Sequence, residues 1–247
     1  MKNFGANPGL LRKIHRNYKV ARHEPKIWLL DSLDIGYVKI TKVASSSFEL
    51  MLTNYLHCVI GGQPEADIDK YVTRGYADQY ARHINPKKFT EDIRPGFVFS
   101  FVSNPLDRLY SSYKDKILDE RPPERRHNIF WNHDIDLEMT FDEFVRRIIE
   151  IPDHKIDRHI RSQAWCLWDG SELVADYIGK FENIARDWKT IADRYGFPEL
   201  PHKNKSSRPT LADPYSKETA LLVAERYKDD IRLFGYEQDI KRRIDSL

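Results

Sequence analysis

The chain has 247 residues, of which 40% are hydrophobic, and its 40 basic and 38 acidic side chains leave a formal net charge of +2. These values suit a soluble globular protein with one large α/β domain or at most two small ones, and the balanced charge indicates no nucleic-acid partner. Two cysteines, Cys58 and Cys166, exclude a disulfide framework, and the sequence has no run of about 18 apolar residues that could cross a membrane.

Residues 1–26 form a basic arm in which Glu24 is the single acidic residue. Such a segment could attract a polyanion or a phosphorylated ligand, or it could simply be a solvated terminus. The arm lacks the apolar core of a secretory signal. A cytoplasmic location is therefore expected.

The first predicted unit is a strand, a tight loop and a helix. Residues 35–41 (IGYVKIT) are rich in β-branched and aromatic side chains, which is typical of a strand. From Phe48 to Val59, apolar residues recur at helical spacing, and Gly61 and Gly62 are expected to end this helix.

The same plan is predicted again further along the chain. Residues 95–105 contain a nearly continuous apolar run, which is typical of a strand buried on both faces, and Pro105 suits the first turn of the next helix. Later elements follow the same alternation: helices from Thr140, from about Asn183 and from Ser216, and a strand at 174–181. The chain has no repeats and no linker. It is therefore predicted to form one α/β domain over residues 1–247, with a central, mostly parallel sheet flanked by helices in three layers, as in a P-loop-like fold.

The segment TKVASSSFELM (residues 41–51) places a lysine three residues ahead of three consecutive serines, between a predicted strand and a predicted helix. A helix N-terminus exposes unpaired N–H groups and partial positive charge, which together can bind an anion. The serines add hydroxyl donors, and Lys42 adds a full positive charge. The segment favours an anion-binding loop over the alternative of a plain structural turn. A P-loop kinase is less well supported, because its GxxxxGK[ST] motif has the lysine near the end and this loop has no glycine.

The segment from Lys42 to Phe48 (KVASSSF) resembles the 5′-phosphosulfate loop of carbohydrate sulfotransferases, in particular the heparan-sulfate 2-O and chondroitin branches. Residues 101–116 (FVSNPLDRLYSSYKDK) resemble the 3′-phosphate motif of the same family. Weaker similarity follows in the same order at three further segments: 157–163, 177–182 and 204–236. The resemblance runs from about residue 35 to residue 237. It implies a family member that moves a sulfuryl group from a nucleotide donor to a carbohydrate hydroxyl. The lack of an apolar anchor in the sequence favours a bacterial member of the family.

The resemblance also implies roles for the matching residues. The donor would be 3′-phosphoadenosine 5′-phosphosulfate (PAPS), the product would be its desulfated form PAP, and no metal is implied. Lys42 would stabilise charge on the leaving and transferring oxygens, and the serine loop would hold the 5′-phosphate. The residues expected to contact the donor are Lys42, Ala44, Ser45, Ser46, Ser47, Ser103, Arg108, Ser111, Lys205 and Ser206.

One departure from the family pattern concerns the 3′-phosphate. Where the family has an arginine and an aspartate, this chain has Ser103 and Asn104. The arginine would form charge-assisted hydrogen bonds, which are about twice as strong as neutral ones. The basic arm, Lys203, Lys205 or Arg208 could supply the missing charge, or the donor could be bound more weakly.

A general base should take the proton of the acceptor hydroxyl, and histidine or a carboxylate is the usual choice. His83 lies between the two phosphate motifs, where the 2-O branch carries its histidine base, and His159 lies in a DRHIRSQ context that resembles the chondroitin branch. Both are candidates, and Asp157 and Glu182 are weaker ones. Several residues could line an acceptor groove or could simply be surface or core residues: Arg121, Arg125, Arg126, Arg158, Arg161, Trp131, Trp165 and Trp168.

The expected acceptor is a carbohydrate or glycoconjugate, and the sequence does not indicate the oligomeric state. A non-catalytic nucleotide- or glycan-binding module is the alternative from another class, because Ser103 gives a degenerate donor site. The retention of Lys42 favours the enzyme.

Overall fold

The computed structural model describes residues 25–59, 81–119, 135–201 and 213–247. These residues form two compact parts, each built from segments that are distant in the sequence. The sheet part contains the described residues of 25–104 and 163–201, and the helical part contains those of 105–162 and 213–247. The single domain expected over residues 1–247 stays a prediction.

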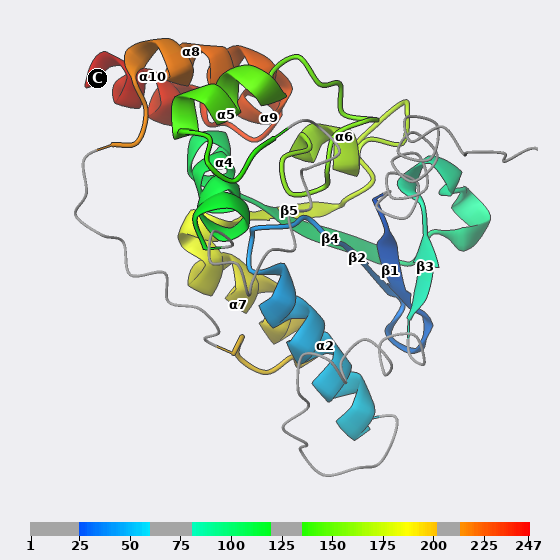
Figure 1. Ribbon diagram of the computed structural model, residues 1–247. Coiled ribbons are helices and arrows are strands. Elements are labelled where there is room, and N and C mark those ends of the chain that lie inside the picture. Colours follow the sequence, from blue (N-terminus) through cyan, green and yellow to red (C-terminus); the bar gives the residue numbers. More distant parts are fainter. Residues whose placement is uncertain (1–24, 60–80, 120–134, 202–212) are drawn as a thin grey trace, which may run out of the picture. The chain divides into compact units, whose positions relative to one another are not determined.

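The sheet part contains a five-stranded sheet with the order β3-β1-β2-β4-β5 (Figure 1). Its strands are β1 Ile27–Leu30, β2 Ile35–Val38, β3 Arg82–Ile84, β4 Phe97–Val102 and β5 Tyr177–Lys180. The pairs β2–β4 and β4–β5 are parallel, whereas β1 pairs antiparallel with both β2 and β3. The sheet is therefore mixed, and the prediction of a mostly parallel sheet is wrong for the half that contains β1. The short connection between β1 and β2 permits only an antiparallel return, since a parallel crossover needs about a dozen residues or more.

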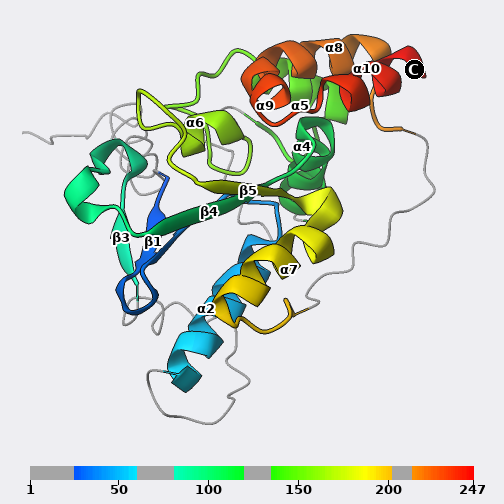
Figure 2. The ribbon, with the colours of Figure 1, turned by 180° about the vertical axis from the view of Figure 1, so that it is seen from behind.

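Helices cover both faces of this sheet. The views in Figures 1 and 2 show α2 (Ser45–Val59) and α7 (Ile184–Tyr195) on one face and the short α6 (Gln163–Leu167) on the other. Between the sheet and α2 and α7, the ring of Phe48 lies 4.6 Å from that of Phe101 and 5.4 Å from that of Trp188, measured between centroids. The α/β class and the flanking helices are thus confirmed.

The helical part is built from short helices around an aromatic core. These are α4 Pro105–Tyr113, which continues as a π-helical turn over Lys114–Leu118, and α5 Phe141–Ile148, α8 Lys217–Arg226, α9 Lys228–Leu233 and α10 Glu237–Asp245. Capping boxes at Thr140 and Ser216 confirm two of the predicted helix starts. The helix predicted after Ser216 is broken at Tyr227, where φ −112° and ψ 28° leave the helical region.

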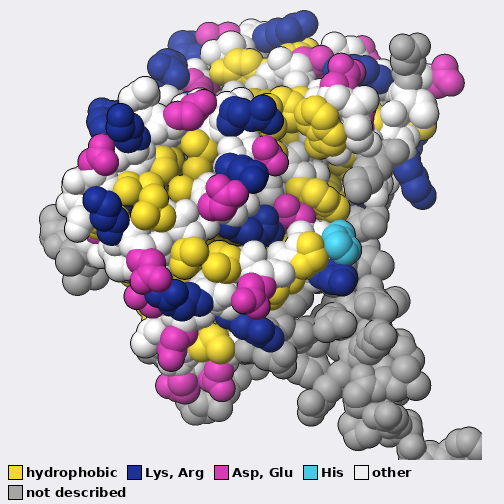
Figure 3. Space-filling view, turned by 90° about the horizontal axis from the view of Figure 1, so that it is seen from above, with side chains coloured by type: hydrophobic (Ala, Val, Ile, Leu, Met, Phe, Trp, Pro, Cys, Tyr) yellow, Lys and Arg dark blue, Asp and Glu magenta, His cyan; other side chains and the backbone are white. Residues whose placement is uncertain are grey.

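The helical part also has a groove of about 930 Å³ lined by residues of α8, α9 and α10. Its lining includes the apolar side chains Leu221, Ile231, Ile240 and Ile244, together with charged residues of both signs. Figure 3 shows acidic and basic side chains interspersed around apolar ones on the face that it presents. Of the predicted site residues that the structure describes, none lines this groove. No helix among the described residues is both long enough and apolar enough to span a membrane.

Candidate functional site

The carboxyl ends of β2, β4 and β5 meet at one edge of the sheet, because these three neighbouring strands run in the same direction. The strand register pairs Val38 with Ser100 and Val102 with Lys180. The segments that follow the three strands therefore lie next to one another, and in open α/β sheets this edge is where ligands bind. The structure thus brings the predicted serine loop close to the segment that begins at Ser103.

The loop between β2 and α2 has an unusual backbone. Lys42 and Ala44 have φ values of 68° and 58°, which are left-handed conformations that L-residues adopt only at a cost. The carbonyl oxygen of Ala44 then accepts hydrogen bonds from the N–H groups of Ser47 at 2.8 Å and Phe48 at 3.1 Å, which closes the first turn of α2. The N–H groups of Ser45 and Ser46, the first two residues of α2, have no acceptor within the helix. The predicted order of strand, loop and helix is confirmed, and the binding of an anion at this N-terminus stays a prediction.

The left-handed conformation of Ala44 leads to a stability prediction. Ala44→Gly is expected to raise the free energy of unfolding by about 0.5–1 kcal/mol, because glycine removes the left-handed strain but loses more entropy on folding. Urea denaturation would measure it. The matched control is Ala192→Gly in the right-handed helix α7, for which a loss of about 1 kcal/mol is expected. Equal losses for both variants would contradict the loop conformation.

Burial alternates along the serine loop. Ile40, Val43, Ser45 and Ser47 are buried, whereas Lys42, Ala44 and Ser46 keep partial exposure. At the start of the loop, Lys39 forms an ion pair with Glu49 of α2. This pair ties the loop to the helix.

The segment after β4 is fixed by side chains from elsewhere in the sheet part. The buried amide of Gln163 accepts a hydrogen bond from the N–H of Ser103 at 3.0 Å and donates one to its carbonyl at 2.9 Å. The N–H of Asn104 donates to the carboxylate of Glu182 at 2.6 Å. Gln163 belongs to the weaker family match at 157–163, but the sequence does not indicate its role, because its partner lies 60 residues away. The carboxylate of Glu182, a weaker base candidate, thus fixes the backbone at Asn104.

The sequence was compared with models of known protein families. The model of the sulfotransferase family matches residues 25–237. The chain belongs to this family.

Curated relatives of this sulfotransferase-family chain are similar but distant. It is 24% identical to carbohydrate sulfotransferase 14 of Danio rerio over 223 residues, which is 81% of this chain and 59% of the relative. It is 24% identical to the Homo sapiens protein of the same name and 25% identical to the Mus musculus protein, in each case over 62% of this chain and 46% of the relative. The chain thus spans about half the length of the curated relatives it matches. No solved structure gave a significant match.

Arg108 of the sulfotransferase-family chain is buried in the helical part rather than presented on its surface. Its guanidinium donates to the carbonyl oxygens of Arg161 at 2.8 Å and Arg158 at 3.3 Å. Arg108 is therefore a positioning residue for the 158–161 backbone, and a contact with the donor stays a prediction. Arg161 is only 1% exposed and donates to the carbonyl oxygens of Asp153 and Ile156, which identifies it as a core residue.

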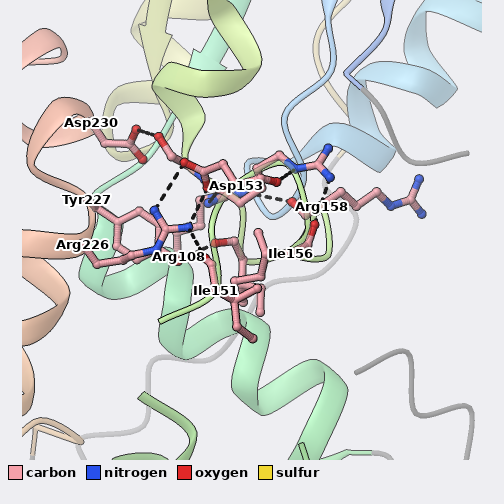
Figure 4. A network of polar contacts seen from close by, with 11 residues as sticks. Arg108, Ile151, Asp153, Ile156, Arg158, Arg226, Tyr227 and Asp230 are labelled. Carbon is pink, nitrogen blue, oxygen red and sulfur yellow. Dashed lines mark hydrogen bonds and ion pairs between the residues drawn. The ribbon is translucent and has the colours of Figure 1, made fainter. Parts of the chain in front are cut away.

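The segment 151–162 is held by a polar network within the helical part (Figure 4). The Arg226 guanidinium contacts both carboxylate oxygens of Asp153, at 2.7 and 3.3 Å, and the carbonyl of Ile151 at 3.2 Å. The hydroxyl of Tyr227 donates to the carbonyl of Ile160 at 2.5 Å, and the hydroxyl of Ser162 donates to the buried Asp230 at 2.7 Å. Helices α8 and α9 thus fix the segment that carries His159.

His159 contacts Asp157 of the same segment. Its Nδ1 lies 2.6 Å from Oδ1 of Asp157, and the His159 carbonyl accepts a hydrogen bond from the hydroxyl of Ser112 at 2.7 Å. Burial raises the pKa of Asp157, but the hydrogen bonds and charge of His159 outweigh it and hold the pKa at about 2. Burial lowers the pKa of His159, and the Asp157 carboxylate opposes this shift.

The remaining predicted site residues are distributed over both parts. His83 lies on β3 in the sheet part, opposite Trp28 in the register, and the two ring centroids are 5.2 Å apart. Ser111 is half-buried on α4 in the helical part. Its partnership with the serine loop stays a prediction. Several predicted residues lie outside the described residues: Arg121, Arg125, Arg126, Trp131, Lys203, Lys205, Ser206 and Arg208.

Proposed function

We propose that this chain transfers the sulfuryl group of PAPS to a hydroxyl of a carbohydrate or glycoconjugate. The observation that carries the proposal is the loop after β2. Two left-handed residues, Lys42 and Ala44, turn the chain into the N-terminus of α2, where three serines follow. Membership of the sulfotransferase family supports PAPS as the donor, and the names of the three relatives, each a carbohydrate sulfotransferase, support a carbohydrate acceptor.

In the proposed reaction, the 5′-phosphate of PAPS is held by the N–H groups of Ser45 and Ser46 and by the hydroxyls of Ser45, Ser46 and Ser47, at the positive end of α2. The acceptor oxygen attacks sulfur in line, the bond between sulfur and the phosphate oxygen breaks, and PAP leaves with the bonding electrons. Lys42 stabilises the charge that develops on that phosphate oxygen, which is the kind of preorganised electrostatic term that dominates such transfers. The arrangement is P-loop-like in its logic, with left-handed non-glycine residues in place of glycines.

The 3′-phosphate half of the site differs from the family pattern. The N–H of Ser103 is already used by Gln163, so Ser103 can offer an anion only its hydroxyl. Ser111 lies on α4 in the helical part, and the resemblance of residues 101–116 to the 3′-phosphate motif of the family supports a role for Ser111 in binding the 3′-phosphate. Neutral hydroxyls imply weaker donor binding than an arginine would give.

The first experiment is a calorimetric titration with PAP, accompanied by a transfer assay with labelled PAPS against a panel of carbohydrate acceptors. We expect one PAP site with a micromolar Kd, equivalent to about −8 kcal/mol, and label transfer to at least one acceptor. PAP binding without transfer to any acceptor would favour the nucleotide-binding module.

The alternatives give different results. Absence of PAP binding would overturn the donor assignment. An increase in Tm with ATP and magnesium, and none with PAP, would instead identify a kinase. The same titration at two salt concentrations adds a check, because binding of a multiply charged ligand by lysine and helix dipole weakens as salt is raised.

A further inference from the structure

In the segment 157–159, one carboxylate oxygen of Asp157 contacts both the backbone and the ring of His159. Oδ1 of Asp157 accepts a hydrogen bond from the backbone N–H of His159 at 2.8 Å and lies 2.6 Å from its Nδ1. Such turns are formed when an aspartate bonds to the backbone two residues later. Here the same oxygen also reaches the imidazole, so the backbone and the ring of His159 are fixed together.

This contact sets the tautomer of the ring. An ionised carboxylate only accepts hydrogen bonds, and Asp157 stays ionised because the contacts with His159 keep its pKa at about 2 in spite of its burial. Nδ1 of His159 must therefore carry the proton, which leaves the lone pair on Nε2. Among the residues that the structure describes, Nε2 of His159 has no hydrogen-bond partner.

A histidine with a purely structural role would normally use both ring nitrogens when it is buried. The His159 side chain is mostly buried but keeps 14% of its surface exposed, and Nε2 is not among the buried atoms that lack a partner. The Ser112 hydroxyl holds the His159 carbonyl at 2.7 Å, and Arg108 holds the preceding carbonyl at 3.3 Å. Asp157 thus anchors Nδ1, Ser112 and Arg108 hold the backbone on either side of the ring, and Nε2 is left available.

We propose that Asp157 is a positioning residue, which holds His159 as the Nδ1–H tautomer so that Nε2 takes the proton of the acceptor hydroxyl. This inference rests on the proposed function and selects His159 over His83, whose ring packs against Trp28. As the acceptor oxygen forms its bond to sulfur, its O–H bond breaks and the proton moves to Nε2, while PAP leaves with the electrons of the broken S–O bond. The Asp157 carboxylate then stabilises the imidazolium.

The charged groups around the ring determine the pH dependence. Asp157 raises the pKa of His159, whereas burial, Arg158 and Lys116 lower it. The base works when it is deprotonated, so kcat should rise with pH through the His159 pKa. Asp157→Asn removes the carboxylate that raises this pKa, and the acid limb of the kcat profile should move to lower pH.

The test measures kcat and the KM for PAPS from about pH 5 to 9 in the full chain. For Asp157→Asn we expect kcat to fall about 10- to 100-fold with little change in KM, together with the shifted acid limb. For His159→Gln we expect a fall of about 100-fold and no remaining limb, in line with general-base catalysis. Asp169→Asn is the matched control, since Asp169 closes a similar turn with Ser171 and contacts no histidine of the described residues. Its kcat profile should match that of the wild type.

A folded Asp157→Asn variant with the wild-type kcat and acid limb would overturn the inference. So would a parallel loss of kcat and Tm without a shift of the limb, which is what a structural pair would give. If Asp157→Asn does not fold, the kcat of His159→Gln tests the base itself, and a wild-type kcat in this variant would overturn the inference.

A second readout keeps this inference separate from the proposed function. Nitrogen-15 NMR of the histidine rings should show the Nδ1–H tautomer for His159, and a changed tautomer balance in Asp157→Asn. An Nε2–H tautomer in the wild type would overturn the inference even if the enzyme is active. Failure of PAP binding and transfer in the wild type would count against the proposed function instead.

Discussion

Replacing Lys42 by alanine is expected to lower kcat about 10²- to 10³-fold, which is the usual effect of removing one donor that stabilises charge in the transition state. Lys42 occupies a left-handed position in the loop that begins at the carboxyl end of β2. In the proposed reaction, negative charge grows on the phosphate oxygen as the S–O bond breaks. If a side chain stabilises this charge in the transition state more than it stabilises the bound substrate, its removal lowers kcat. Transfer kinetics with labelled PAPS would measure the loss.

Two further variants separate charge from loop geometry. Lys42→Met keeps most of the length of the side chain, and its kcat should fall as far as that of Lys42→Ala. Lys42→Arg keeps the charge and should retain part of the wild-type kcat. Lys39→Met is the matched control, because Lys39 lies in the same loop and is paired with Glu49. We expect it to affect Tm more than kcat. If Lys42→Met keeps the wild-type kcat, Lys42 does not stabilise the leaving group.

The sequence predicted the central elements well where local signals agree. Residues 35–41 were predicted as a strand, and β2 covers 35–38, while the run at 95–105 contains β4 at 97–102. The capping residues Thr140 and Ser216 begin helices as expected. These elements have their signal within a few residues: a continuous apolar run or a side chain that bonds to the third residue along.

The elements that were missed have no such local signal. β1 is only four residues long, and β3 is the three-residue segment RHI, which is partly exposed and stays in the sheet by pairing with β1. The short helix α6 also lacks a local signal, because the buried Gln163 at its start is fixed by a contact with Ser103, which is distant in the sequence. Tertiary pairing, rather than propensity, determines these elements.

The candidate site shows the same division. The serine loop could be predicted from its position between strand and helix, because the N-terminus of a helix binds anions wherever it occurs. The spacing of Asp157 and His159 was also a usable signal, since an aspartate two residues before another residue commonly bonds to its backbone. The burial of Arg108 and Arg161 could not be predicted, because their acceptors are backbone carbonyls that the fold assembles.

The segment that carries His159 depends on charged groups that are removed from solvent. Arg226 and Asp153 keep only 12% and 17% of their side-chain surface exposed, and Asp153 also accepts a hydrogen bond from the N–H of Ser162 at 2.9 Å. Removing one member of such a pair leaves the other charge without compensation in a medium that solvates it poorly. A broken pair therefore costs much more than an exposed ion pair, which is worth about 0–1 kcal/mol.

Asp153→Ala is accordingly expected to lower the free energy of unfolding by about 3–5 kcal/mol, a large share of the 5–15 kcal/mol that is usual for a folded domain. Urea denaturation would measure it. The control is Glu225→Ala, which removes an exposed ion pair with Lys228 in the same part and should cost less than about 0.5 kcal/mol. The double variant Asp153→Ala with Arg226→Met should regain part of the loss, because it removes the uncompensated charge as well. Equal small losses for Asp153→Ala and Glu225→Ala would show that the network is not what holds the 151–162 segment in place.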